Sequence, residues 1–241
     1  METRTLELET SDGPMPVYEA RPDGDATRAV IVIQEAFGVN DHIEDVTRRL
    51  AEAGYHAVAP HLFHRAGGGT APYGDFSKVI PLYEKLDDAG LLVDLDATRE
   101  HLHQAGSSDR QIGIVGFCFG GRVTFLAALR RRLGAAVGFY GGGIVTQRFP
   151  QFPALVGEAA ALQTPWLGLF GEQDESIPVE DVEQLRKAIR EASVETDVVL
   201  YPDAGHAFHN DQRDSYRQAQ AKDAWARTLE WFERHLQALN S

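Results

Sequence analysis

Short aliphatic runs recur along the chain, and segments with helical periodicity separate them. The clearest run is Ala29–Ile33, which is entirely apolar and mostly β-branched. A run without polar alternation is typical of a strand buried on both faces of a parallel sheet. Apolar residues then repeat at helical spacing as far as Gly54, a stop signal, and Asn40 or Asp41 is placed to cap this helix.

The same alternation continues to the end of the sequence. Further strands are predicted at Tyr55–Pro60, Gln111–Val115, Ala135–Tyr140, Trp166–Phe170 and Thr196–Tyr201. Helices are predicted to end near His103 and to cover Gly121–Arg131, Pro178–Ala192 and Ser215–Leu239. An opening hairpin is predicted from strands at Leu6–Glu9 and Pro16–Ala20, joined by turn residues 11–14. We therefore predict a single α/β domain over residues 1–241, with a mostly parallel sheet covered by helices on both faces.

Composition and charge exclude several classes of partner. The 241 residues carry 36 acidic and 23 basic side chains, which gives a formal charge of −13. This balance disfavours nucleic acid and anionic membranes, since both require a basic surface. We find no apolar leader and no run long enough to cross a bilayer, so we expect a cytoplasmic protein. The single cysteine, Cys118, excludes an intrachain disulfide and a CxxC metal site.

The segment around Cys118 carries the strongest chemical signal. A buried strand leads into Gly116-Phe-Cys118-Phe-Gly120, which matches the nucleophile-elbow pattern with cysteine in place of serine. A sharp strand-to-helix turn strains the central residue and requires nearly side-chainless neighbours. It also exposes the thiol at a helix N-terminus, which favours the thiolate. The competing interpretation is a small buried cysteine in a tight turn.

Two further residues favour the catalytic interpretation. Asp174 follows the strand that ends at Phe170, and His206 follows the strand that ends at Tyr201. Nucleophile, acid and histidine, each after its own strand, is the chain order of the α/β-hydrolase fold. We therefore expect His206 to act as the base for Cys118 and Asp174 to orient His206. The acids Glu172, Glu175 and Asp203 compete with Asp174 for the third role.

Ester cleavage also needs donors for the oxyanion of the tetrahedral intermediate. We predict these donors to be the backbone amides of Phe119, directly after the nucleophile, and Ala36, after the strand that ends at Ile33. Glu35 is unexpected beside a buried strand end. It is either a surface-accessible loop residue or a functional acid facing the thiol. The irregular stretches 61–74 and 141–152 also follow strands and are predicted to wall the site.

Four motifs together resemble the dienelactone hydrolase family, also called carboxymethylenebutenolidases. They are Gln34–Gly38, Gly116–Gly121, Gly171–Asp174 and Gly205–Phe208, and the resemblance extends from about Arg28 to Leu236. It implies an α/β-hydrolase fold and hydrolysis of a small lactone or ester through a thioester, with a Cys-His-Asp triad and no cofactor. It further implies that Glu35 helps to form the thiolate and that Tyr140 lies near the active site. Phe37, Phe208 and Asn210 are the other substrate-binding candidates.

The sequence departs from the family at residues that would bind the substrate. One carboxylate-binding arginine of the family falls at Asn210, which leaves Arg65, Arg148 and Arg213 as candidate replacements. A general short-acyl esterase or thioesterase, and a non-hydrolytic thiol sensor, are therefore the alternative functions.

The sequence also bears on metal binding and on the oligomeric state. The spacings of His61 with His64 and of His206 with His209 can suit zinc, but no third ligand has motif spacing, so we expect no metal site. A monomer or a homodimer is expected.

Overall fold

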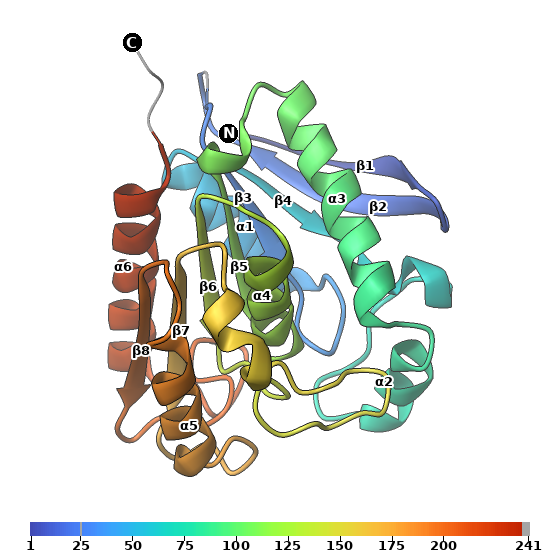
Figure 1. The fold of residues 1–241 in the computed structure, drawn as a ribbon. Helices are drawn as coiled ribbons and strands as arrows, with labels where there is room; N and C mark the ends of the chain where they lie inside the picture. Colours follow the sequence, from blue (N-terminus) through green and yellow to red (C-terminus); the bar gives the residue numbers. More distant parts are fainter. Residues whose placement is uncertain (25, 238–241) are drawn as a thin grey trace.

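A computed structural model describes residues 1–24 and 26–237, and its centre is an eight-stranded sheet (Figure 1). The strands are β1 (Glu2–Thr10), β2 (Gly13–Arg21), β3 (Ala29–Ile33), β4 (His56–Pro60), β5 (Ile112–Phe117), β6 (Ala135–Phe139), β7 (Trp166–Gly171) and β8 (Thr196–Tyr201). They lie in the order β1-β2-β4-β3-β5-β6-β7-β8. β1 and β2 pair antiparallel, β2 meets β4 antiparallel, and all other pairs are parallel. The predicted hairpin and mostly parallel sheet are confirmed.

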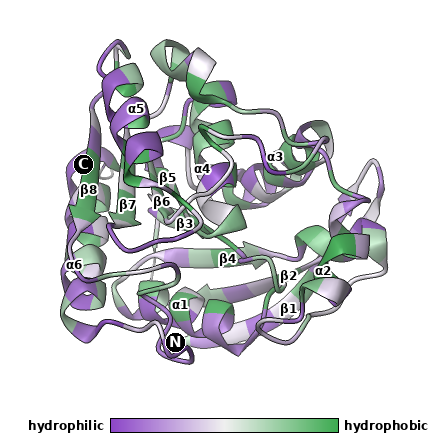
Figure 2. Cartoon of the chain, turned by 90° about the horizontal axis from the view of Figure 1, so that it is seen from below, coloured by the Kyte–Doolittle hydropathy of each residue, from purple (hydrophilic) through white to green (hydrophobic). Residues whose placement is uncertain are grey.

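Helices cover both faces of the sheet, as predicted. The main ones are α1 (Asp41–Glu52), α2 (Phe76–Tyr83), α3 (Asp88–Gln104), α4 (Phe119–Arg130), α5 (Val179–Ile189) and α6 (Gln218–His235). Short 3-10 helices are η1 (Leu62–Ala66), η2 (Asp109–Gln111) and η3 (Val156–Ala161). Figure 2 shows α1 and α6 on one face and α3, α4 and α5 on the other. No helix in the described ranges has the length and apolar character needed to cross a membrane.

Several helix boundaries differ from the sequence expectations, and α5 covers Val179–Ile189 rather than Pro178–Ala192. The helical stretch predicted before His103 is two helices: α2 ends at Tyr83, and Asp87 caps α3 by accepting a hydrogen bond from the Gly90 amide at 2.7 Å. α4 begins at Phe119 rather than Gly121, directly after Cys118. α6 begins at Gln218 rather than Ser215, and its predicted end at Leu239 lies outside the described residues.

Every residue of β3, β4, β5, β6 and β7 is buried, which explains why these strands show apolar runs rather than alternation. Because these strands are parallel, their carboxyl ends meet at one edge of the sheet. The loops that follow β3, β5, β7 and β8 carry Glu35, Cys118, Asp174 and His206. The fold therefore gathers the predicted site residues along one edge.

A buried carboxylate fastens the hairpin to the sheet and to α3. Glu19 on β2 is 1% exposed, and its Oε1 lies 2.7 Å from His56 Nε2 and 2.8 Å from His101 Nε2. Arg4 Nε donates to Oε2 at 2.5 Å. Burial alone would raise the pKa of Glu19, but the hydrogen bonds from the two histidines and from Arg4 outweigh it and hold this pKa far below its usual range.

We expect Glu19→Gln to lower the free energy of unfolding by about 3 kcal/mol at pH 7, because it removes the charge at the centre of a buried cluster. A depressed folded-state pKa stabilises the protein above the unfolded pKa and loses this effect as the pH falls. The difference between the variant and the wild type should therefore shrink below the ordinary glutamate pKa of 4.5. Urea unfolding measures both effects, and Glu7→Gln on exposed β1 is the matched control. Equal unfolding midpoints at pH 7 would contradict this role.

Candidate active site

Cys118 occupies a strained turn between β5 and α4. Its φ of 55° and ψ of −114° lie in a region that L residues rarely adopt. A Cβ on Gly116 would lie 2.2 Å from the Gly120 oxygen, and a Cβ on Gly120 would lie 2.5 Å from the Ile33 oxygen. Both contacts are shorter than real Cβ atoms tolerate, so the two glycines are required for this turn. The elbow expected from the sequence is present in the backbone.

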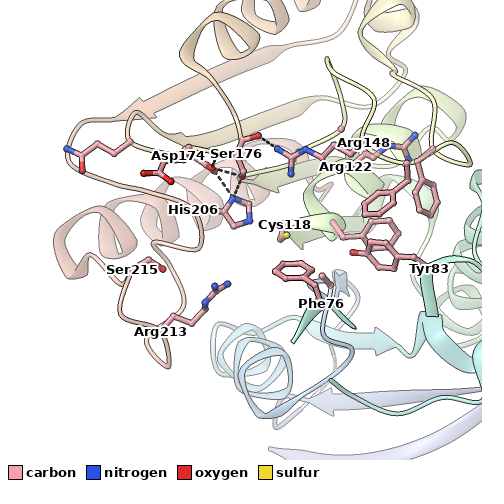
Figure 3. Close-up of a pocket in the computed structure, with 18 residues that line it drawn as sticks. Phe76, Tyr83, Cys118, Arg122, Arg148, Asp174, Ser176, His206, Arg213 and Ser215 are labelled. Carbon is pink, nitrogen blue, oxygen red and sulfur yellow. Dashed lines mark hydrogen bonds and ion pairs between the residues drawn. The ribbon is translucent and has the colours of Figure 1, made fainter. Parts of the chain in front are cut away.

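Asp174 and His206 form a close pair on neighbouring loops. His206 Nδ1 lies 2.6 Å from Asp174 Oδ2, and Figure 3 shows the pair beside Cys118. The second carboxylate oxygen accepts from the Ser176 hydroxyl at 2.6 Å and the Ser176 amide at 2.9 Å. Burial opposes the charge on Asp174, but the hydrogen bonds from His206 and Ser176 outweigh it and lower its pKa. Asp174 therefore remains ionised and fixes the orientation of the imidazole. Sequence reasoning did not identify Ser176.

His206 is held as a strong base. Burial lowers its pKa, but the negative charge on Cys118 and the hydrogen bonds to Asp174 and Cys118 outweigh this effect and raise the pKa to about 10. A protonated imidazole beside a cysteine sulfur is an arrangement that can activate a cysteine as a nucleophile.

The two residues that carry the predicted oxyanion donors line the same cavity as Cys118. Phe119 opens α4, so its amide has no acceptor within the helix. Ala36 lies in the turn after β3 and lines the same cavity as Cys118. Its amide donates to no protein acceptor among the described residues. Both amides are thus free for a substrate oxygen.

Glu35 is fully buried, so the surface-accessible alternative is wrong. Its Oε2 accepts from Asn210 Nδ2 at 3.0 Å, while Oε1 has no hydrogen-bond partner within residues 1–24 and 26–237. Burial raises the pKa of Glu35, although the nearby positive charges of Arg213 and His206 oppose the shift. The turn after β3 therefore holds a buried acid directly before Ala36, whose amide is the predicted oxyanion donor.

Tyr73 links this buried acid to two loops. Its hydroxyl accepts hydrogen bonds from Asn40 and Asn210, each at 2.9 Å. Burial and the charge of Glu35 raise the pKa of Tyr73 to about 12, so the phenol stays protonated and can donate to Glu35. The sequence offered no signal for Tyr73 beyond its place in the irregular stretch 61–74.

The remaining substrate-binding candidates lie behind the cavity wall. Tyr140 is fully buried, and its ring centroid is 5.1 Å from that of His206. Phe37 packs edge-on against Tyr73 at 5.1 Å, and Phe208 lies 5.5 Å from Tyr140. None of these three residues, nor Asn210, lines the cavity. They support the loops that carry the lining residues.

A cavity of about 570 Å³ opens over Cys118. Its lining residues are Ala36, Phe76, Tyr83, Cys118, Phe119, Arg122, Gly142, Gly143, Arg148, Phe149, Phe152, Gln173, Asp174, Glu175, Ser176, His206, Arg213 and Ser215. Arg148 and Arg213 are thus in the site, and neither forms an ion pair with a carboxylate in the described ranges. Arg65 instead binds Asp94 and Asp12 away from the cavity.

The histidine pairs considered for zinc have other contacts. His64 Nε2 lies 2.9 Å from Asp94, and the His209 ring stacks on Phe117 with centroids 5.3 Å apart. Glu19 with His56 and His101 is a group with ligand atoms within 4.8 Å of one another, as a metal would require. The carboxylate of that group is already occupied by the hydrogen bonds described above.

Comparison with known proteins gives consistent results. A model of the dienelactone hydrolase family matches residues 15–236. A Salmonella typhimurium protein described as a "putative carboxymethylenebutenolidase" is 45% identical over 228 residues, covering 92% of this chain and 83% of the relative. A protein of the same description from Yersinia pestis is 42% identical over 92% of this chain and 84% of its own length. A crystal structure from Klebsiella pneumoniae, described as a "putative dienelactone hydrolase", is 39% identical and covers 97% of this chain and 98% of its own, with a TM-score of 0.88.

Proposed function

The chain belongs to the dienelactone hydrolase family and is a carboxylic ester hydrolase, and we propose that it cleaves a small lactone or ester through a thioester on Cys118. The observation that carries this proposal is the alignment of Cys118, His206 and Asp174 on three post-strand loops around one cavity. The Cys118 thiolate attacks the ester carbonyl, and the amides of Phe119 and Ala36 stabilise the oxyanion. His206 then gives its proton to the leaving alcohol oxygen, and the thioester remains.

The same groups then activate a water molecule, which hydrolyses the thioester. His206 takes a proton from a water molecule, whose oxygen attacks the thioester carbonyl. The acid leaves and the Cys118 thiolate is restored with His206 protonated, which balances the proton given to the alcohol. Asp174 holds the imidazole in the tautomer that both half-reactions need.

Arg148 and Arg213 support an anionic group on the substrate. Arg148 is exposed and also donates to the Ser176 backbone oxygen, and Arg213 is half-buried with its guanidinium over the Tyr73 ring. Neither forms an ion pair with a carboxylate in the described residues, so each can bind a substrate carboxylate through charge-assisted hydrogen bonds. These residues offer the positive charge that Asn210 lacks.

The experiment is steady-state hydrolysis of a dienelactone and of p-nitrophenyl acetate, with Cys118→Ala beside the wild type. Turnover that depends on Cys118 is expected on at least one substrate. A preference for the dienelactone supports the lactonase, and a preference for the aryl ester supports the short-acyl esterase. A thiol that is consumed once, with no second turnover on either substrate, would contradict the proposal and favour a thiol sensor.

Glu35→Gln tests the proposed role of the buried acid in forming the thiolate. We expect kcat/KM to fall about 10²-fold, which is the scale of a lost acid–base group. Iodoacetamide alkylation of Cys118 in the presence of a substrate analogue should slow in parallel. Glu175→Gln, which alters another acid of the cavity lining, is the comparison. Unchanged alkylation and turnover would remove Glu35 from the mechanism.

A further inference from the structure

The cavity has two chemically different sides, and Cys118 lies between them. Figure 3 shows His206 and Arg213 on one side of the thiol and Phe76 and Tyr83 on the other. Asp174, Ser176 and Ser215 complete the polar side, while Arg122 and Arg148 line the cavity on the side of the rings. Phe119, Phe149 and Phe152 pack around Tyr83 and complete the other side, which we call the aromatic wall: Phe76, Tyr83, Phe119, Phe149 and Phe152.

Most rings of the aromatic wall pack on one another. The Tyr83 centroid lies 4.9 Å from that of Phe119, 5.1 Å from Phe149 and 6.0 Å from Phe152. Phe119 and Phe152 are 5.3 Å apart. These separations and the tilted or edge-on angles are those that aromatic pairs favour. Tyr83, Phe119, Phe149 and Phe152 therefore hold one another in place, whereas Phe76 is 55% exposed and packs against Phe37.

Buried polar contacts hold the wall from behind. Arg122 is 2% exposed, binds both oxygens of Asp88 at 2.7 and 3.0 Å, and places its guanidinium 5.2 Å from the Phe152 ring. Its Nη2 also donates to the Pro153 oxygen at 2.7 Å. Gln151 donates to the backbone oxygen of Tyr83 at 3.0 Å, which ties the 141–152 stretch to α2. Preorganised contacts of this kind reduce the entropy cost of binding.

The position of the proton donor, His206, indicates which half of the substrate lies on each side of the cavity. His206 must protonate the leaving alcohol oxygen, so the alcohol half lies on the polar side, near Arg213 and Ser215. The acyl half stays bonded to Cys118 and extends away from His206, toward the aromatic wall. A cavity of 570 Å³ is in the range that holds ligands much larger than an acetyl group.

We propose that the aromatic wall is the acyl-binding pocket and that esters of acids carrying an aromatic ring are preferred over esters of small aliphatic acids. This inference rests on the proposed hydrolysis through Cys118. Contacts to the acyl group persist in the thioester, so the wall acts on both formation and hydrolysis of that intermediate. A pocket contact of one methylene changes kcat/KM by about 10–200-fold, and a whole ring should change it by at least 10-fold.

The test compares p-nitrophenyl acetate with p-nitrophenyl phenylacetate, which share a leaving group and differ only in the acyl half. We expect the wild type to favour phenylacetate at least about 10-fold in kcat/KM. Phe149→Ala should lower this ratio at least about fivefold, and Phe149→Leu, which keeps more of the packing, should lower it less. Ile80→Ala, an exposed α2 position outside the cavity lining, is the control and should leave the ratio and the activity unchanged.

Two results would overturn the assignment. One is a wild-type ratio near one while p-nitrophenyl acetate is hydrolysed in a Cys118-dependent manner, which leaves the hydrolase function intact and removes the acyl pocket. The other is that Phe149→Ala changes the selectivity for the alcohol half instead, measured as the ratio of kcat/KM for phenyl acetate to that for ethyl acetate. Loss of all Cys118-dependent turnover would instead refute the proposed function itself.

Discussion

Cys118→Ala should abolish ester hydrolysis while the protein remains folded. We expect kcat to fall at least about 10⁴-fold, because no other group in the cavity replaces a nucleophile that forms a covalent intermediate. Alanine keeps the Cβ that the elbow already accommodates, and Cys118 is only half-buried. The free energy of unfolding should therefore change by less than about 1 kcal/mol. Initial rates and urea unfolding of the same preparation measure both quantities.

Cys118→Ser separates the identity of the nucleophile from its position. The hydroxyl occupies the same turn, but His206 has to deprotonate a much weaker acid, so we expect activity well below the wild type and above the alanine variant. If Cys118→Ala retained more than a few per cent of the wild-type rate, the nucleophile would lie elsewhere.

Asp174→Asn should cost about 10⁴-fold in kcat, the scale of losing the carboxylate that orients a catalytic histidine. The amide cannot accept the Nδ1–H in the same way as the carboxylate at 2.6 Å, so the imidazole can adopt the wrong tautomer. The carboxylate also raises the pKa of His206. Removing it lowers that pKa, and the alkaline limb of the pH–rate profile should move to lower pH. The profile is measured with p-nitrophenyl acetate.

Asp203→Asn is the matched control for this prediction. Asp203 is the competing acid on the loop that carries His206, its φ of 60° is tolerated by asparagine, and its carboxylate accepts from Gln173 rather than His206. Activity close to the wild type is expected. A large loss in Asp203→Asn with little loss in Asp174→Asn would exchange the two roles.

Local sequence patterns predicted the sheet and the elbow because both depend on short-range constraints. An unbroken run such as Ala29–Ile33 is incompatible with a half-exposed strand, and a sharp turn at Cys118 admits only glycine at positions 116 and 120. The break between α2 and α3 was missed, although Asp87 three residues before Gly90 is a capping signal.

Contacts between segments that are distant in the sequence could not be predicted from local patterns. Tyr73 meets Asn210 across 137 residues, and Glu19 meets His101 across 82. The sequence did not decide whether Glu35 is exposed or buried, because its burial depends on how the stretch 61–74 folds over it. It also left three candidate arginines, and only the folded loops bring Arg148 and Arg213 to the cavity while Asp94 holds Arg65 elsewhere.

The most direct test of the central claim is to trap the acyl-enzyme. The protein is mixed with p-nitrophenyl acetate, quenched in acid during turnover, and analysed by intact mass and peptide mapping. We predict a mass increase of one acyl group on the peptide that contains Cys118, released by neutral hydroxylamine and absent from Cys118→Ala. Acyl label on another residue, or equal labelling of the alanine variant, would contradict a thioester mechanism at Cys118.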